Sequence, residues 1–170
     1  MFELVIPQFI KMLGNVQQYL DKAQQHAELK KYDVNVLLTT RLTPDQYPFL
    51  KQVQIVCDGA KGAAARLSGQ TAPVHEDTEK TVEELRKRVE KTVAYLKTFS
   101  AEDFSGWKER QVDIFWAPGK WLPGFEYLTQ IAVPNFYFHL TTAYAVLRHA
   151  GVDVGKMDYL GDVKFRDKAY

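Results

Sequence analysis

Residues 134–161 read PNFYFHLTTAYAVLRHAGVDVGKMDYLG, and the first half of this stretch has apolar side chains at three- and four-residue steps. This spacing predicts an amphipathic helix. Asn135 and His139 are four residues apart, so a helix places them one turn apart on the same face. Thr142 continues the polar row along the flank of the apolar face. The stretch therefore presents two polar side chains where a helical-bundle metalloenzyme would place two ligands.

The same periodicity predicts three further helices upstream of this stretch. The first covers residues 2–30, the second residues 45–67 and the third residues 77–99. Thr43 is predicted to cap the second helix, and Pro44 to occupy its first position. The linker before the third helix is long enough, when extended, to run along much of a bundle, so these two helices need not be antiparallel neighbours.

A different pattern separates the third helix from the last one. Residues 111–116 read QVDIFW, in which apolar side chains alternate, and a turn signal and the sequence KWL follow. This pattern predicts a short β-hairpin-like crossover. The last helix is expected over residues 125–150, and Pro134 should kink it or divide it into a short and a longer helix.

The composition predicts one ordinary globular domain over residues 1–170. Apolar residues make up 46% of the chain and charged residues 25%, and the net charge is +1. Acidic and basic residues are interleaved, so the charge pattern points to neither nucleic acid nor an anionic membrane as a partner. No signal peptide is visible, and no apolar run approaches the roughly 20 residues that span a bilayer. We therefore expect a cytoplasmic, all-α, single-domain protein.

Three segments carry a resemblance to a known family. They are TPDQYPFLKQVQIVCDGAKGAAARLSG at residues 43–69, LPGF at residues 122–125 and the stretch at residues 134–161. On these segments the chain resembles the DinB-like superfamily of bacterial four-helix bundles, named for DNA-damage-inducible proteins and described as metalloenzymes. More closely, it resembles an uncharacterised bacterial subfamily described as a domain of unknown function. The resemblance implies a DinB-like four-helix bundle, and it implies a homodimer because relatives are commonly dimers.

The resemblance also implies where a metal would bind. Active members of the superfamily hold a divalent metal with three histidines, one on the second helix and two in an H-x-x-x-H pattern on the fourth. In this sequence His139 matches the second histidine of that pattern and Asn135 matches the first. The second helix has no histidine, and its nearest inward polar residue is Gln52. One family ligand of three is present, which puts in doubt metal binding and the thiol-transfer and isomerase activities of relatives.

Two functional hypotheses follow for this site. One imidazole with two uncharged amides is a poor ligand set for zinc or nickel. The first hypothesis is therefore a homodimeric small-molecule-binding protein that needs no cofactor, because its metal site is lost or weakened. Its ligand pocket would be formed by Gln52, Asn135, His139 and Thr142. The competing hypothesis is a thiol-transferase- or hydrolase-like enzyme that holds a divalent metal, such as zinc or nickel, on His139 and Asn135. A structural role, with His139 at the edge of the core and hydrogen-bonded to Asn135, Thr142 or a neighbouring helix, is the simplest alternative.

Other polar or small residues of the second helix have simpler interpretations. Cys57 is on the apolar side without an adjacent base, so we expect a buried, unreactive thiol. Asp58 lies nearly opposite the apolar stripe, which predicts a side chain that faces solvent or another subunit. Ile55, Gly59 and Gly62 form a patch of small residues that would let another helix approach closely.

Overall fold

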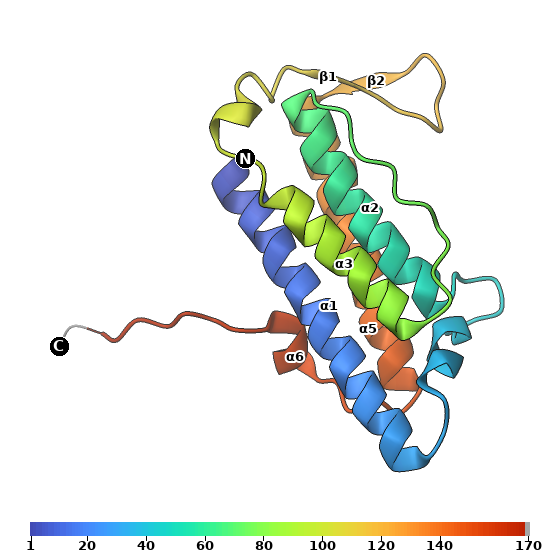
Figure 1. Cartoon of the computed structure of the whole chain (residues 1–170). Coiled ribbons are helices and arrows are strands. Elements are labelled where there is room, and N and C mark those ends of the chain that lie inside the picture. Colours follow the sequence, from blue (N-terminus) through green and yellow to red (C-terminus); the bar gives the residue numbers. More distant parts are fainter. Residues whose placement is uncertain (169–170) are drawn as a thin grey trace.

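Four long helices pack side by side in a computed structural model that describes residues 1–168 (Figure 1). They are α1 (Phe2–Lys30), α2 (Phe49–Ser68), α3 (Val82–Leu96) and α5 (Val133–His149). α2 packs against both α3 and α5, and α1 packs most closely against α3. The predicted all-α bundle is confirmed. None of the helices in the described part of the chain is long and apolar enough to cross a bilayer.

Shorter elements connect and cap the bundle. They are the 3-10 turns η1 (Val34–Thr39) and η2 (Glu102–Phe104), the strands β1 (Gln111–Asp113) and β2 (Trp121–Pro123), the helix α4 (Gly124–Tyr127), the π-turn η3 (Leu128–Ala132) and the helix α6 (Lys156–Leu160). β1 and β2 pair antiparallel, with Val112 opposite Leu122. The predicted hairpin crossover is therefore present between α3 and the last helical segment.

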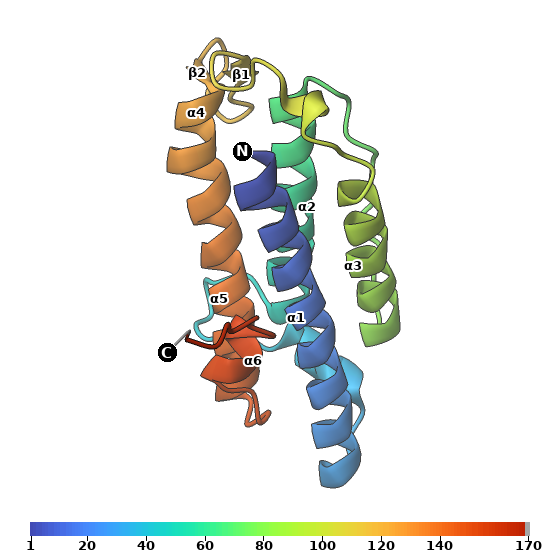
Figure 2. The same cartoon turned by 90° about the vertical axis from the view of Figure 1, so that its left-hand side faces the viewer.

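The direction of each helix follows from the long linker over residues 69–81. This linker runs back along the bundle, so α2 and α3 start at the same end and lie parallel (Figure 1). α1 and α5 run in the opposite direction, and the hairpin closes one end of the bundle (Figure 2). The expectation that the second and third helices need not be antiparallel is thus met.

The second helix begins later than predicted, and Pro48 explains why. The N-cap of α2 is Pro48, with φ −69° and ψ 166°, rather than Thr43. A proline disfavours helical backbone at the residue before it, so Tyr47 cannot continue a helix into Phe49. Instead, the Phe49 N–H donates to the carbonyl oxygen of Thr40, 2.9 Å away. The predicted helix entry at Thr43 and Pro44 is wrong, and these residues form a loop.

The third helix is shorter than the predicted span of residues 77–99. Thr81 Oγ1 accepts a hydrogen bond from the Glu84 N–H at 3.1 Å, and the Glu84 carboxylate accepts one from the Thr81 N–H at 3.1 Å. This capping box satisfies two backbone donors at the helix start. The spacing of Thr81 and Glu84 marks this start in the sequence, and the N-cap Thr81 comes four residues after residue 77, the start that periodicity alone predicts.

The last helical segment is divided near Pro134, as predicted. α4, η3 and α5 form one continuous column (Figure 2), in which the π-turn comes directly before α5 and Pro134 occupies the first turn of α5. Inside a continuous helical column, a proline lacks the N–H that would donate to the preceding turn, and the π-turn directly before α5 accommodates this break in the hydrogen-bond ladder. At the other end of the column, a Cβ on Gly124 would overlap the carbonyl oxygen of Trp107. Only glycine allows α4 to start against this loop.

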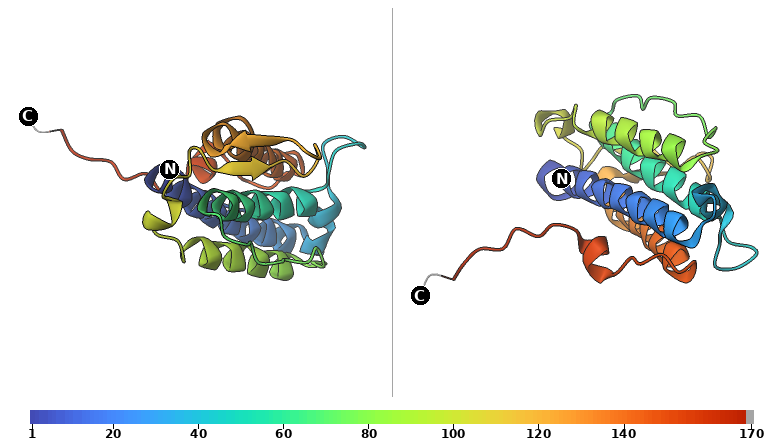
Figure 3. Two further views of the ribbon diagram at one scale, coloured as in Figure 1. Left: turned by 90° about the horizontal axis from the view of Figure 1, so that it is seen from above. Right: turned by 60° about the horizontal axis from the view of Figure 1, so that its bottom comes forward.

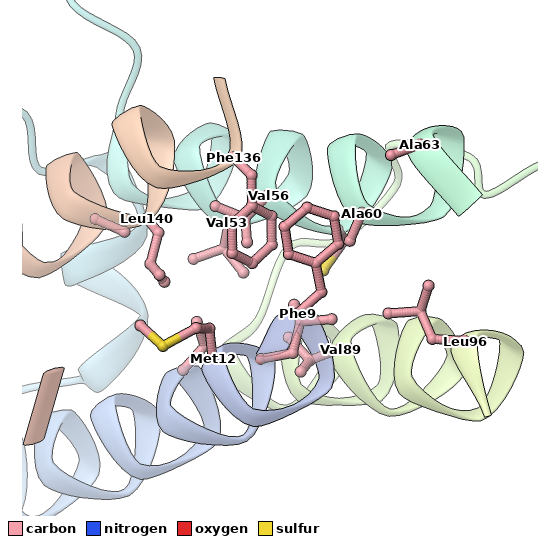
Figure 4. Packing of buried hydrophobic residues seen from close by; sticks show 14 of the residues in the cluster. Phe9, Met12, Val53, Val56, Ala60, Ala63, Val89, Leu96, Phe136 and Leu140 are labelled. Atoms are coloured by element: carbon pink, nitrogen blue, oxygen red, sulfur yellow. The ribbon is translucent and has the colours of Figure 1, made fainter. Parts of the chain in front are cut away.

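The hydrophobic core lies where the four long helices meet. The rings of Phe9 on α1 and Phe136 on α5 stack with their centroids 4.2 Å apart. Figure 4 shows side chains from all four helices converging on this stack: Phe9, Met12, Val53, Val56, Ala60, Val89, Leu96, Phe136 and Leu140. Each belongs to the apolar periodicity of its own helix, so the core supports the helix assignments made from the sequence.

The segment after α5 packs back onto the bundle. Val152 and Val154 are fully buried, and α6 packs against α1. Asn15 Nδ2 donates to the carbonyl oxygen of Tyr159 at 2.8 Å. Two buried valines in a short polar segment give too little periodicity to predict a helix, so this element follows from docking rather than from local pattern.

Candidate functional site

His139 and Gln52 are joined by a direct hydrogen bond between α5 and α2. His139 Nδ1 lies 2.7 Å from Gln52 Oε1, and Gln52 Nε2 donates to the carbonyl oxygen of Tyr47 at 2.8 Å. A carbonyl oxygen only accepts, so the amide nitrogen of Gln52 must face Tyr47 and its oxygen must face His139. His139 Nδ1 is therefore the donor, and Nε2 carries the lone pair.

Burial keeps this imidazole neutral. Gln52 is almost fully buried and His139 is half-buried. Burial disfavours the charged imidazolium and lowers the pKa of His139 below its usual value. At neutral pH the side chain is a neutral ring that donates from Nδ1, which suits an interhelical brace.

The other two predicted pocket residues do not join this pair. Thr142 Oγ1 donates to the carbonyl oxygen of Phe138 at 2.8 Å, so its hydroxyl is satisfied within its own helix. Asn135 is exposed, and its Nδ2 lies 3.7 Å from the position that a Cβ on Gly59 would take. The structure therefore brings Gln52 and His139 together and places Asn135 beside Gly59, where α5 approaches α2 closely.

These donors do not fit the metal that the resemblance implies. His139 Nδ1 and Gln52 Oε1 are hydrogen-bonded to each other. His139 Nε2 is therefore the one strong metal ligand that this pair still offers. Within residues 1–168, no three His, Cys, Asp or Glu side chains group closely enough to hold a metal ion. Zinc sites use three or four such ligands, and uncharged amides leave the charge of the cation uncompensated. The hypothesis of a lost metal site remains a prediction for experiment.

A pocket of about 490 Å³ lies next to Asn135. α2 contributes one wall, the column of α4, η3 and α5 contributes another, and the hairpin contributes the third. Figure 3 shows from above how the hairpin lies across the end of the bundle between α2 and the column. The apolar lining consists of Ile55, Ile114, Phe115, Trp116, Ile131 and Ala132. The polar lining consists of Asp58, Arg66, Asp113, Tyr127 and Asn135.

The π-turn shapes this pocket. Tyr127 directly precedes η3, and Ile131 and Ala132 lie within it; all three line the cavity. A π-turn inserts an extra residue into the helical repeat and redirects the side chains around it, which is why such turns are frequent at functional sites. The pocket has no signal in the sequence, because helical periodicity does not reveal a single π-turn.

The charge of Asp58 is neutralised within the chain. Its Oδ2 lies 2.8 Å from Arg88 Nη2, and its Oδ1 lies 2.9 Å from Lys61 Nζ. The expectation that Asp58 faces solvent is met in part, because its side chain is 40% exposed. The prediction did not include the buried arginine on the neighbouring helix α3 that holds its carboxylate. Residue spacing along α2 could not reveal a partner that comes from α3.

Arg88 on α3 holds the linker over residues 69–81 against α2 and α3 through ion pairs. Its side chain is almost completely buried, and it also pairs with Asp77 at 2.9 Å and Glu79 at 3.0 Å. Burial by itself would raise the pKa values of these two carboxyls, but hydrogen bonds from Lys51 and Gln54, together with Arg88, hold them below their usual range. This ion cluster around a buried arginine fixes the path of the linker.

Cys57 is a core residue, as predicted. Its side chain is fully buried, and burial raises the pKa of the thiol to about 12. A thiol with such a pKa is almost entirely protonated at neutral pH, so it is a poor nucleophile.

Comparison with known proteins agrees with this architecture. A family model described as domain of unknown function (DUF1993) matches residues 1–160. The chain is 48% identical to a DinB family member protein from Shewanella denitrificans whose crystal structure superposes with a TM-score of 0.95. That match covers 98% of this chain and 95% of the other. No curated protein matches the sequence. The likeness extends over the four helices and the hairpin crossover.

Proposed function

The chain belongs to the DinB-like family described as domain of unknown function DUF1993, and from this premise we propose that it is a small-molecule-binding protein. The proposal rests on one observation above all: the cavity of about 490 Å³ beside Asn135 combines apolar walls with a few polar groups. This volume and this lining are typical of small-molecule sites, which hold apolar surface with a few polar groups for orientation.

His139 has a supporting role in this proposal. Its hydrogen bond to Gln52 links α5 to α2, one turn from the helix segment that carries Asn135 towards the pocket. The pair thus braces the two helices that form opposite walls. A brace needs satisfied hydrogen bonds rather than a metal, and the Gln52 bond to Tyr47 completes the set.

We also propose that the protein works as a cytoplasmic homodimer. The support is the dimeric state of many superfamily members and the exposed aromatic ring of Phe138 on the outer face of α5, which is 59% exposed. Light scattering after size exclusion measures the oligomeric state. A monomer at micromolar concentration would overturn this part of the proposal without affecting the ligand pocket.

The ligand site can be tested by filling it. Gly59 lines the pocket, and a Cβ there meets only Asn135 Nδ2 at an ordinary contact distance of 3.7 Å. Gly59→Leu should therefore fold and occupy the cavity. Gly14→Leu is the matched control, because a Cβ on Gly14 in α1 meets nothing within 4 Å. A small-molecule library is screened by thermal shift, and binders are confirmed by calorimetry.

We expect ligands that bind the unmodified chain and Gly14→Leu to lose binding in Gly59→Leu. Binders that are indifferent to Gly59→Leu would place the site elsewhere and refute the proposal.

The competing metal-dependent enzyme is tested separately. Protein purified without chelator or a histidine tag is incubated with zinc, nickel or manganese, desalted and examined by elemental analysis. We expect no stoichiometric metal. A stoichiometric zinc or nickel that disappears in His139→Ala would overturn the metal-free proposal and favour the thiol-transferase- or hydrolase-like alternative on His139 and Asn135.

A further inference from the structure

We propose that the pocket binds molecules with a single carboxylate on an apolar body, and that Arg66 holds the carboxylate at the mouth of the cavity. The inference rests on the proposed function and adds the chemical class of the ligand. It follows from the charges left free at the pocket, the way Arg66 is oriented, and the nature of the walls.

Among the charged residues that line the pocket, Arg66 on α2 has no anionic partner in the described part of the chain. Asp58 is paired with Arg88 and Lys61. Within residues 1–168, Arg66 pairs with no carboxylate, and its one hydrogen bond runs from Nη1 to the Tyr127 hydroxyl at 3.2 Å. A guanidinium has five N–H donors in a planar fork, so most of them remain free. Arg66 is therefore the group that an anionic ligand would neutralise.

The orientation of Arg66 is set by its neighbours on two helices. A Cβ on Gly62 would overlap Arg66 Nη1, so the arginine side chain lies back across the preceding turn of α2 in the space that Gly62 leaves open. On the other side, the guanidinium carbon lies 5.9 Å from the centroid of the Tyr127 ring. Contact with an aromatic face and a hydroxyl acceptor holds the fork in place at the pocket edge. A preorganised fork suits the two oxygens of a carboxylate.

The hairpin wall of the pocket is aromatic and suits a ligand with an apolar body. Phe115 and Trp116 on the hairpin pack edge to face with centroids 4.8 Å apart, yet they are 80% and 57% exposed. Aromatic surface left in water beside a cavity gains free energy when a ligand covers it. Because Arg66 is itself exposed, the carboxylate would sit at the mouth and the apolar body would point inward.

Alternative ligand chemistries fit the lining less well. A phosphate monoester carries nearly two charges and is usually held by several donors, whereas this pocket offers one free guanidinium. Asp113 also lines the pocket, and it would favour an amine. However, this carboxylate is exposed and already accepts a hydrogen bond from Gln111 Nε2 at 2.9 Å. One of its oxygens is therefore engaged, whereas most N–H groups of Arg66 are free.

The test uses ligands that share an apolar body and carry an anionic, neutral or cationic end group. Indoleacetate and octanoate are titrated into the full chain by calorimetry, beside indoleacetamide, octanamide and tryptamine. We expect each acid to bind about tenfold more tightly than its amide, which corresponds to one charge-assisted contact. Arg66→Met should weaken the acids to the level of the amides and leave the amides unchanged. Arg148→Met, which removes an exposed arginine from the far end of α5, should change neither.

A second variant keeps the charge and moves the guanidinium. Gly62→Ala adds only a methyl group within α2, but that methyl takes the space in which Arg66 lies. We expect its thermal midpoint to stay at or above that of the unmodified chain, while the preference for acid over amide falls. A preference that persists in Gly62→Ala would show that Arg66 is not the anchor.

The outcomes separate this inference from the proposed function. Equal binding of acids and amides, no binding of either acid, or a preference for tryptamine would overturn the carboxylate assignment, and the last would point to Asp113. Acid binding that survives Gly59→Leu unchanged would instead refute the pocket itself, and with it the proposed function.

Discussion

The Nδ1 atom of His139 lies 2.7 Å from the Oε1 atom of Gln52, and this bond joins α5 to α2 inside the bundle. In the resemblance to DinB-like proteins, His139 matches a histidine that ligates the metal in active members. Gln52 is the polar residue nearest to the position of the second-helix histidine in those members. In this chain the two side chains meet directly. A hydrogen bond thus makes the connection between helices that a shared metal would make in an active relative.

The first prediction concerns the tautomer of His139. Because Gln52 presents its oxygen to the ring, we expect the proton on Nδ1 and the lone pair on Nε2 at neutral pH. Heteronuclear NMR that correlates the ring carbon protons with both nitrogens distinguishes the two tautomers. A proton on Nε2, or fast exchange between both tautomers, would contradict the assigned geometry.

The same pair predicts a stability effect. Gln52→Leu leaves the His139 Nδ1–H and the Tyr47 carbonyl without partners, so we expect the free energy of unfolding to fall by about 1–3 kcal/mol. Gln18→Leu is the control, because Gln18 lies exposed on α1 and should change stability by less than about 0.5 kcal/mol. Urea denaturation measures both. A loss no larger than that of the control would show that the hydrogen bond does not brace the helices.

Acidification should destabilise the fold partly through His139. Burial lowers the pKa of His139 in the folded chain, whereas the unfolded chain has the usual histidine pKa near 6.5. Between these two values the unfolded state binds more protons, so stability falls as the pH drops below about 6.5 and the loss ends near the folded pKa. We expect His139→Gln to lose less stability than the unmodified chain between pH 7.5 and 5.5.

The pH experiment needs one internal comparison. His75 also has a lowered pKa, because of burial and the nearby Lys61 and Arg88, so it contributes in the same direction. Urea denaturation of His75→Gln and His139→Gln at both pH values separates the two contributions. If His139→Gln shows the full pH dependence of the unmodified chain, the imidazole is not buried as described.

The ion cluster around Arg88 should be essential for stability. Arg88→Met leaves Asp58, Asp77 and Glu79 without their shared cation. Asp58 keeps its ion pair with Lys61, and Asp77 keeps its ion pair with Lys51. Glu79 is left largely buried without its cation, so we expect the free energy of unfolding to fall by about 1.5–3 kcal/mol. Lys87→Met is the control, since its ion pair with Glu83 is exposed and 3.9 Å long and should be worth less than about 1 kcal/mol. Similar losses in both variants would contradict a special role for the buried arginine.

Two glycines should respond to alanine in opposite directions. Gly14 lies in α1 with nothing within 4 Å of an added Cβ, so Gly14→Ala should raise the free energy of unfolding by about 0.5–1 kcal/mol. A Cβ on Gly124 would overlap the Trp107 carbonyl oxygen, so Gly124→Ala should lower it by about 1–3 kcal/mol. Denaturation curves of both variants give the answer, and effects of the same sign would refute the packing described here.

The sequence predicted the helices where apolar side chains repeat without interruption. α1 has the predicted bounds of residues 2–30. α2 and α3 begin later than the periodicity predicts, because Pro48 and the capping box of Thr81 and Glu84 set their starts. Both signals are local and are present in the sequence. The helix α6 is different, because it depends on docking against α1.

The site was only partly predictable. The residues Gln52 and His139 were identified as polar groups on inward faces, but their direct bond depends on how α2 and α5 face each other. The pocket beside Asn135 depends on a π-turn and on a hairpin that folds over the end of the bundle. The roles of Arg66 and Asp58 depend on partners from other helices, Tyr127 and Arg88. The spacing of residues within one helix does not reveal any of these contacts between helices.

The order of residues alone determined that this protein is a bundle of four amphipathic helices with a hairpin before the last helical segment, because helix formation and the burial of an apolar face follow from spacing within one segment. The tertiary structure alone decided which polar groups meet. Hydrogen bonds and ion pairs act over a few ångströms, so the pairing of His139 with Gln52 and the freedom of Arg66 appear only when the helices are packed against one another.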